Sequence, residues 1–229
     1  MVKILELFSG TGSVGKVCKQ LGWETLSVDI DGRADINCDI LSWDYKQYPK
    51  DYFDAIWASP PCASFSVLQY SWIGRNRDGK IFTREDIETN MTNVGDPLAK
   101  RTLEIINYFK PELWFMENPN TGNLKNREYM IDLPCYIVDY CMYSDWGYRK
   151  RTRIWTNKKD WKPLTCDNKG TCGNMIGSLH KTNLGNTERL LKAEKRLKHK
   201  EDVSGLKKRT SLDDRYRIPE DLIFSLFLD

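Results

Sequence analysis

The chain has 229 residues, of which 40% are hydrophobic and 29% charged, and its formal net charge is +3. These values are typical of an ordinary soluble protein with one large domain, or with one domain and a small insert. No apolar run reaches the length of a membrane span and the start, MVKILELFSG, has no signal-peptide pattern, so we expect a cytoplasmic protein without a membrane partner. Seven cysteines, an odd number, indicate reduced thiols rather than a disulfide framework.

Strand-like and helix-like patterns alternate along the first part of the chain. A helix is expected at 13–21, and another at 96–109, with Asp96 as the N-cap and Pro97 at the first helical position. Repeated βα units of this kind predict an α/β fold with a doubly wound, mostly parallel sheet. The strands are expected at 2–8, 24–30, 35–40, 53–58, 113–116, 136–142 and 153–156.

Two segments interrupt this alternation. Residues 67–95 are rich in Asn, Asp, Gly and Arg and predict a long loop that is either functional or disordered. Residues 158–213 are basic and lack βα periodicity. The apolar end of the chain predicts a short helix that returns to the core. We therefore divide the chain into a main domain at 1–157, a small basic segment at 158–213 and a C-terminal helix at 214–229.

Charge is distributed unevenly along the chain. Residues 147–217 carry 20 Lys and Arg against 8 Asp and Glu, whereas residues 1–146 carry 15 against 21. A basic segment behind an acidic body is either a solvated surface or the electrostatic footprint of a polyanion. The asymmetry favours a nucleic-acid partner.

A glycine turn, FSGTGSVG, connects the first predicted strand to the first predicted helix. Gly10 and Gly12 allow the backbone to pass close to a ligand, and the helix N-terminus favours polar or negative groups. Neither a dinucleotide fingerprint nor a P-loop fits this spacing well. Asp29 ends the second strand, where a carboxylate can bind ribose hydroxyls, and Asp39 ends the third, where one can bind an adenine amino group. Together these residues predict a cofactor that carries a nucleoside.

The stretch ASPPCASFS places Cys62 in a stiff turn directly after a predicted buried strand. Pro60 and Pro61 cannot continue a sheet ladder, so the backbone turns there and presents the thiol at the carboxyl end of the strand. Ligands of open α/β sheets bind at that end. Cys62 is therefore either a functional thiol or a small buried hydrophobe, and this stretch alone does not decide between the two.

Four motifs, in this order, resemble those of the cytosine-5 DNA methyltransferases, and in particular the short viral or phage-type members. LELFSGTGSVG resembles the motif for S-adenosylmethionine, SPPCASFS the proline-cysteine motif, MENP the glutamate motif and RKRTRIW the arginine motif. RIPEDLIFSL is similar, more weakly, to the helix of the last motif. The resemblance covers the chain to about residue 157 and implies a Rossmann-like methyltransferase fold that uses S-adenosylmethionine.

The same resemblance implies a role for individual residues. Cys62 would add as a thiolate to carbon 6 of a flipped cytosine, because carbon 5 alone is too poor a nucleophile to take a methyl group. Glu117 would bind N3 of the ring, and Arg151 and Arg153 would lie near the target nucleotide, with Arg153 closest to the base. The residues implied for the cofactor are Phe8, Ser9, Gly10, Gly12, Asp29, Asp39, Ile40, Pro60 and Leu103.

The implied partner is double-stranded DNA, bound by a monomer in a bacterium or in the host cell of a virus or phage. Residues 158–213 would recognise the target, and residues 67–95 would be a mobile loop that closes over the flipped base. Arg149 and Lys150 are expected to form a solvated basic turn. Two alternatives stay open. The first is a cytosine-5 methyltransferase of transfer RNA. The second is a non-catalytic family member that binds DNA, which the presence of Cys62, Glu117 and Arg153 together disfavours.

The basic segment also contains Cys166, Cys172 and His180 in the spacing C-x5-C-x7-H. This spacing is looser than the CxxC pairs of structural zinc sites, and it does not identify a fourth ligand, which could be His199 or another cysteine. The three residues are therefore either zinc ligands that stabilise a segment with few apolar positions, or two reduced thiols and a surface histidine.

Overall fold

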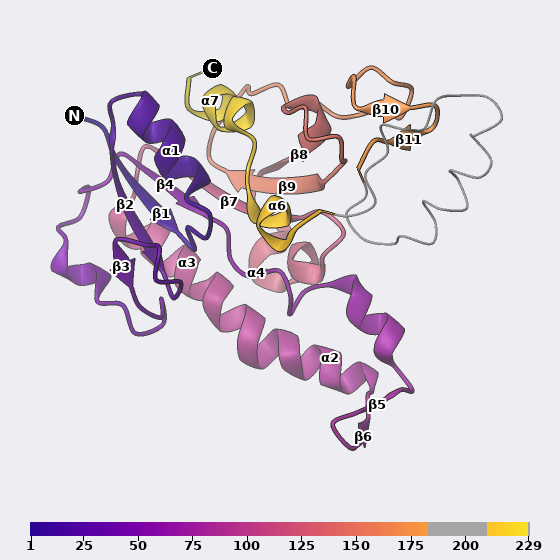
Figure 1. The fold of residues 1–229 in the computed structure, drawn as a ribbon. Helices are drawn as coiled ribbons and strands as arrows, with labels where there is room; N and C mark the ends of the chain where they lie inside the picture. Colours follow the sequence, from indigo (N-terminus) through magenta and orange to yellow (C-terminus); the bar gives the residue numbers. More distant parts are fainter. Residues whose placement is uncertain (183–209, 229) are drawn as a thin grey trace.

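The computed structural model describes residues 1–182 and 210–228, which form a seven-stranded sheet with helices on both faces (Figure 1). The strand order is β3-β2-β1-β4-β7-β9-β8, and β9 is antiparallel to both of its neighbours. This arrangement confirms the predicted doubly wound, mostly parallel sheet. The strands are β1 (Lys3–Leu7), β2 (Glu24–Asp29), β3 (Ile36–Asn37), β4 (Ala55–Ala58), β7 (Leu113–Pro119), β8 (Cys135–Asp139) and β9 (Arg151–Thr156).

The helices pack on the two faces of the sheet, and short elements fill the connections. Within the described residues, no helix combines the length and the apolar character that a membrane span requires. The α-helices are α1 (Ser13–Gln20), α2 (Arg84–Asn90), α3 (Asp96–Phe109), α4 (Glu128–Ile131), α6 (Leu212–Tyr216) and α7 (Glu220–Leu228). The short helices are η1 (Tyr45–Gln47), η2 (Val67–Trp72), η3 (Met91–Gly95), η4 (Asn123–Asn126) and η5 (Tyr140–Met142), and two small hairpins pair β5 (Asn76–Arg77) with β6 (Lys80–Ile81) and β10 (Met175–Ile176) with β11 (Leu179–His180).

Alternate side chains of the central strands form two apolar layers. Ile4 of β1 and Trp57 of β4 belong to the cluster that includes α1 and α7, whereas Leu5 and Ile56 belong to the cluster that includes α3. Successive side chains of a strand point to opposite faces, so a strand that is covered on both faces must be apolar at almost every position. This is why β4 is apolar at every position, and why Ile4, Leu5 and Leu7 of β1 are apolar on both faces of the sheet.

The C-terminal helix α7 packs against α1, on the same face of the sheet (Figure 1). The ring of Phe227 lies edge-on to Trp23, with 5.5 Å between ring centroids, and the backbone N–H of Ile218 donates a hydrogen bond of 3.1 Å to the hydroxyl of Ser13. The last described part of the chain therefore completes the core beside the glycine turn. Most of the basic segment, including His199, lies outside the described residues.

The segment at 67–95 differs from its predicted loop. Helix α2 continues through the π-helical turn η3 into α3, so that 84–95 are helical. Thr83 and Asp86 form a capping box at the start of α2, a start signal that the polar composition of the segment obscured. Asp96 is not an N-cap either: it lies within the continuous helix and binds Arg127 and Tyr129. The predicted closure over a flipped base can therefore concern only 67–83.

Gly95 allows this long helix to pass close to the turn that follows Cys62. A Cβ atom at Gly95 would lie 2.6 Å from Cζ of Phe65, a separation that side chains do not adopt. Phe65 is fully buried there with Met91 and Ala99. The helix thus fixes the chain immediately beyond the proline turn.

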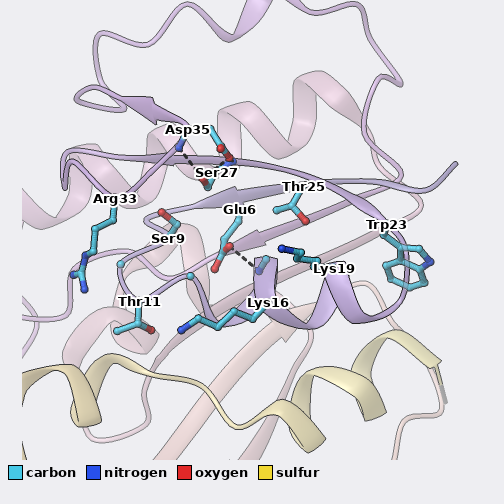
Figure 2. Close-up of a pocket in the computed structure, with 13 residues that line it drawn as sticks. Glu6, Ser9, Thr11, Lys16, Lys19, Trp23, Thr25, Ser27, Arg33 and Asp35 are labelled. Atoms are coloured by element: carbon cyan, nitrogen blue, oxygen red, sulfur yellow. Dashed lines mark hydrogen bonds between the residues drawn. The ribbon is translucent and has the colours of Figure 1, made fainter.

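Glu6 is a buried carboxylate that stabilises the start of α1. It is 2% exposed, and its oxygens accept hydrogen bonds from the backbone N–H groups of Val14 (3.2 Å) and Gly15 (2.9 Å), in the first turn of the helix. Figure 2 shows the carboxylate of Glu6 pointing toward this turn. The N-cap residue, Gly12, has no side chain to accept these bonds. Burial raises the pKa of Glu6 to about 7, although both N–H groups oppose the shift.

We expect Glu6→Gln to make the free energy of unfolding less dependent on pH. Because the folded-state pKa of about 7 lies above the ordinary 4.5, the folded protein binds an additional proton between these values, and its stability falls as pH rises through that window. The loss is complete above the folded pKa and is on the order of 3 kcal/mol. Urea unfolding of both proteins from about pH 5 to about pH 8 measures it, with the exposed Glu24→Gln as control. Parallel pH curves for the wild type and Glu6→Gln would contradict this role.

Candidate functional site

A cavity of about 1070 Å³ lies at the carboxyl ends of the parallel strands. Open α/β sheets bind ligands at this end of the strands. The loops that follow two neighbouring strands turn to opposite faces of the sheet there and leave a crevice between them. The cavity brings together residues that are distant in the sequence, including residues of the C-terminal part such as Ile218. Of the residues predicted for the site, it is lined by Phe8, Ser9, Gly10, Asp29, Asp39, Ile40, Pro60, Cys62, Glu117 and Arg151.

The glycine turn and Asp29 form one wall of this cavity. The backbone N–H of Gly10 donates a hydrogen bond of 2.8 Å to Oδ2 of Asp29, and the N–H of Asp31 donates one of 2.9 Å to Oδ1. Phe8 and Gly10 both have left-handed backbone conformations, with φ of 57° and 48°. The turn is therefore sharp enough to bring the backbone after β1 against the carboxylate at the end of β2.

Two residues predicted for the cofactor lie away from this wall. Gly12 is the N-cap of α1 and lines a smaller cavity of about 480 Å³, beside Glu6, Lys16 and Lys19 (Figure 2). Leu103 packs in the apolar cluster on the far side of α3. The residue of α3 that lines the main cavity is Leu98.

The displacement of Leu103 corrects its predicted place and follows from helix geometry. Leu98 and Leu103 are five positions apart, which turns them about 140° from one another around the helix axis. The two side chains therefore cannot face the same cavity. The resemblance in sequence predicted that a leucine of α3 lines the cofactor cavity. The leucine that lines the main cavity is Leu98, not Leu103.

Cys62 lies in the turn that follows β4, partly exposed to the cavity. The side-chain amide of Asn118, at the end of the neighbouring β7, donates a hydrogen bond of 2.9 Å to the carbonyl of Pro60 and so holds the turn in place. Burial, and then the nearby charge of Glu117, raise the pKa of the Cys62 thiol, whereas the charge of Lys150 lowers it. The reactivity of the thiol therefore depends on the balance between these two neighbours.

Glu117 is a buried carboxylate at the cavity wall, 5% exposed. Its Oε1 accepts a hydrogen bond of 3.1 Å from the hydroxyl of Tyr140 and lies 3.2 Å from Nζ of Lys150. The ammonium of Lys150 also lies over the ring of Tyr140, 4.8 Å from its centroid. The prediction of a solvated turn is therefore wrong for Lys150, because a buried carboxylate needs a partner of opposite charge. The sequence alone did not predict this ion pair, because Lys150 lies between two arginines and nothing there distinguishes it from them.

The arginines of the same motif bind a second buried carboxylate, Asp139 at the end of β8. Arg149 donates to it at 2.9 Å and Arg151 at 2.7 Å, so the predicted solvated turn is also wrong for Arg149. Burial opposes ionisation of Asp139, but the hydrogen bonds from Arg151 and Arg149 outweigh it and lower the pKa. Arg149 and Arg151 line the cavity. Arg153 lies outside this lining and donates to Asn120 and to Sγ of Cys135 instead.

Beyond β8, the sulfurs of Cys166 and Cys172 lie together with the imidazole of His180, as the sequence interpretation in favour of zinc requires. Both Sγ atoms are 3.6 Å from Nε2 of His180. A third sulfur, that of Cys141, completes a group whose ligand atoms all lie within 4.8 Å of one another. Sequence spacing could not identify Cys141, because it precedes β9 and stands far from the other two cysteines in the chain.

The chain is similar to known methyltransferases, although no family model matches it. A protein of Frog virus 3 (isolate Goorha) named probable DNA (cytosine-5)-methyltransferase is 49% identical over 176 residues, which make up 76% of this chain and 79% of that protein. Among solved structures, the Entamoeba histolytica methyltransferase EhMeth is 15% identical over 72% of this chain and 55% of its own, with a TM-score of 0.49. The S. pombe Dnmt2 methyltransferase is 15% identical over 73% of this chain and 52% of its own, with a TM-score of 0.43. The chain thus spans about half the length of these two solved structures.

The thiol pKa of Cys62 should respond in opposite directions to its two charged neighbours. Lys150→Met removes a charge that favours the thiolate and should raise the pKa, whereas Glu117→Gln removes one that opposes it and should lower the pKa. The rate of alkylation by iodoacetamide, followed at the Cys62 peptide by mass spectrometry across a pH series, measures both shifts. Lys159→Met, at an exposed lysine, is the matched control. Identical pH profiles in all four proteins would exclude the electrostatic coupling.

Proposed function

The chain belongs to the DNA (cytosine-5)-methyltransferase family, and on this premise we propose that it transfers the methyl group of S-adenosylmethionine to carbon 5 of cytosine in double-stranded DNA. One observation carries the proposal: a single cavity is lined by the glycine turn and Asp29 beside β1 and β2, and by Cys62 and Glu117 beside β4 and β7. A methyl donor and a nucleophile that activates a base must act in one shared space.

The wall formed by the glycine turn suits the nucleoside part of S-adenosylmethionine. Asp29 is oriented by two backbone N–H groups and is proposed to accept hydrogen bonds from the ribose hydroxyls. Asp39 is proposed to accept one from the adenine amino group, between the apolar side chains of Phe8 and Ile40. When bound, the cofactor supplies an electrophilic methyl group. Gly10 leaves room for it, since a Cβ atom there would approach only the carbonyl of Phe8, at 4.0 Å.

The wall that contains Cys62 is proposed to activate the base. The thiolate of Cys62 forms a bond to carbon 6 of cytosine and shifts electron density to carbon 5, which takes the methyl group. Carbon 5 then gives its proton to a water molecule, and the Cys62 thiolate leaves as the carbon 5–carbon 6 double bond is restored. Glu117 is proposed to bind N3 in its protonated form.

Two observations support DNA as the partner. The similar viral protein is named probable DNA (cytosine-5)-methyltransferase, and residues 147–217 carry 20 Lys and Arg against 8 Asp and Glu, an excess that suits the phosphates of a nucleic-acid backbone. The cytosine must leave the base stack to reach Cys62, at a cost of a few kcal/mol. We propose that residues 158–213 recognise the target, that the protein acts as a monomer, and that it does so in the cytoplasm of the cell; its relative from a virus supports an infected host.

The function is tested by methyl transfer from radiolabelled S-adenosylmethionine to duplex DNA and, in parallel, to transfer RNA. We expect label in carbon 5 of DNA cytosines, and no transfer by Cys62→Ala or Cys62→Ser. Cys18→Ala is the matched control, because Cys18 is buried in the core away from the cavity. Duplex DNA with 5-fluorocytosine should form a covalent complex with the wild type and with Cys18→Ala but with neither Cys62 variant, since fluorine cannot leave as a cation. Transfer confined to transfer RNA would favour the RNA alternative, and normal turnover in either Cys62 variant would end the proposal.

The cofactor site makes a separate prediction. Asp29→Ala removes a charged acceptor and should weaken binding of S-adenosylmethionine by roughly tenfold to hundredfold, which corresponds to about 1.5–3 kcal/mol. Isothermal titration calorimetry without DNA measures the affinity directly. Asp44→Ala, at an exposed position after β3, should bind as the wild type does. Equal affinities for Asp29→Ala and wild type would remove Asp29 from the proposed ribose site.

A further inference from the structure

Four metal-ligating side chains from three separate parts of the chain converge at the edge of the sheet. Cys141 lies in η5, directly after β8; Cys166 and Cys172 lie in the connection that follows β9; and His180 lies on β11. Their ligand atoms are all within 4.8 Å of one another, and the four residues are buried or partly buried. Cys141 and Cys166 are buried, whereas Cys172 and His180 are half-buried beside them.

We propose that Cys141, Cys166, Cys172 and His180 bind one Zn²⁺ ion. Zinc binds thiolate sulfur at about 2.3 Å and imidazole nitrogen at about 2.0–2.1 Å, and tetrahedral geometry then separates sulfur from nitrogen by about 3.6 Å. The two sulfur–nitrogen separations here, from Cys166 and Cys172 to Nε2 of His180, are both 3.6 Å. Three cysteines and one histidine fill all four positions. The site is thus of the closed, structural kind and has no open position for a substrate.

Hydrogen bonds from neighbouring groups hold the proposed ligands in place. The backbone N–H of Asn168 donates to Sγ of Cys166 at 3.4 Å, which stabilises a thiolate. The buried side-chain amide of Asn174 donates to the carbonyls of Cys141 (2.8 Å) and Cys172 (3.0 Å), and its oxygen accepts from the N–H of Gly147 at 3.0 Å. These bonds join the segment that supplies Cys141 to the segment that supplies Cys172.

The proposed ion would also fix two arginines of the cavity. Three thiolates and Zn²⁺ carry a net charge of about −1, which is favourable near the guanidinium groups of Arg149 and Arg151. The backbone N–H of Cys166 donates to Oδ2 of Asp139 at 2.8 Å, and Asp139 in turn binds both arginines. The ion therefore holds Cys166, through it Asp139, and through Asp139 the basic wall of the cavity. It acts as a positioning element and takes no part in methyl transfer.

Metal analysis of the full chain, purified without chelators and without a polyhistidine tag, tests the site independently of the proposed function. We expect about one equivalent of zinc per chain. The content should fall to near zero in Cys141→Ser and Cys172→Ser. His180→Ala should lose the ion, whereas His180→Cys should retain it, because a fourth thiolate can replace the imidazole. Cys38→Ser is the matched control and should keep the zinc, since Cys38 lies at the opposite end of the sheet, after β3.

A second measurement keeps the test decisive where a variant does not fold. Exchange of the wild-type protein into Co²⁺ should give the intense visible bands of a tetrahedral site and sulfur-to-metal charge-transfer absorption in the near ultraviolet. A folded, zinc-supplemented wild type that contains no metal would overturn the proposal. So would a disulfide among Cys141, Cys166 and Cys172 in the purified protein, or retention of the ion in both cysteine variants. A variant that has lost zinc but binds S-adenosylmethionine with the affinity of the wild type would show that the metal site and the cofactor site are independent.

Discussion

A buried carboxylate, Asp139, is the group on which the functional half of the molecule depends. Its side chain is fully inaccessible, so the charge must be neutralised within the protein. Arg149, Arg151 and the backbone of Cys166 supply that neutralisation from three directions. A single charge at the end of β8 thereby fixes the basic wall of the cavity and the beginning of the segment that carries the metal-ligating cysteines. Loss of any one partner would leave the others to compensate for a buried charge.

The order of the strands, rather than the order of the motifs along the chain, brings the site together. β1 lies between β2 and β4, and β7 lies beside β4, so the glycine turn, Asp29, Cys62 and Glu117 all lie at or near the carboxyl ends of neighbouring strands. β9 enters antiparallel beside β7, and its N-terminal end brings Arg151 to that same edge. One reversed strand is thus sufficient to deliver a basic motif to a cavity that is otherwise built by parallel strands.

Apolar patterning correctly predicted the parts of this fold whose residues are chosen mainly by burial between the two layers of helices. The strands β1, β4 and β7 are rich in apolar residues because they are covered on both faces, and α1 begins at the residue that the glycine turn indicates. The sequence did not reveal features that depend on tertiary partners. Lys150 is charged like its neighbours in the chain, and only the buried Glu117 distinguishes it. Leu98 and Leu103 are chemically alike and differ only in their angle around α3. Cys141 follows β8, and it lies beside Cys166 because the chain after β9 returns to the end of β8, where the backbone N–H of Cys166 donates to Asp139.

The sheet separates two kinds of thiol that need opposite surroundings. In the proposed reaction Cys62 ionises and reaches a carbon atom, and the thiol is accordingly partly exposed in a cavity beside a lysine. Burial, together with the neighbouring Cys166 and Cys172, raises the pKa of Cys141, which means that sulfurs brought this close resist ionisation unless a cation accompanies them. A divalent ion would resolve this conflict and would also shield those sulfurs from oxidation and exchange. Cys62 follows β4 and Cys141 follows β8, and β7 and β9 lie between these two strands, so the proposed reactive thiol and the proposed structural thiols lie apart along the same edge of the sheet.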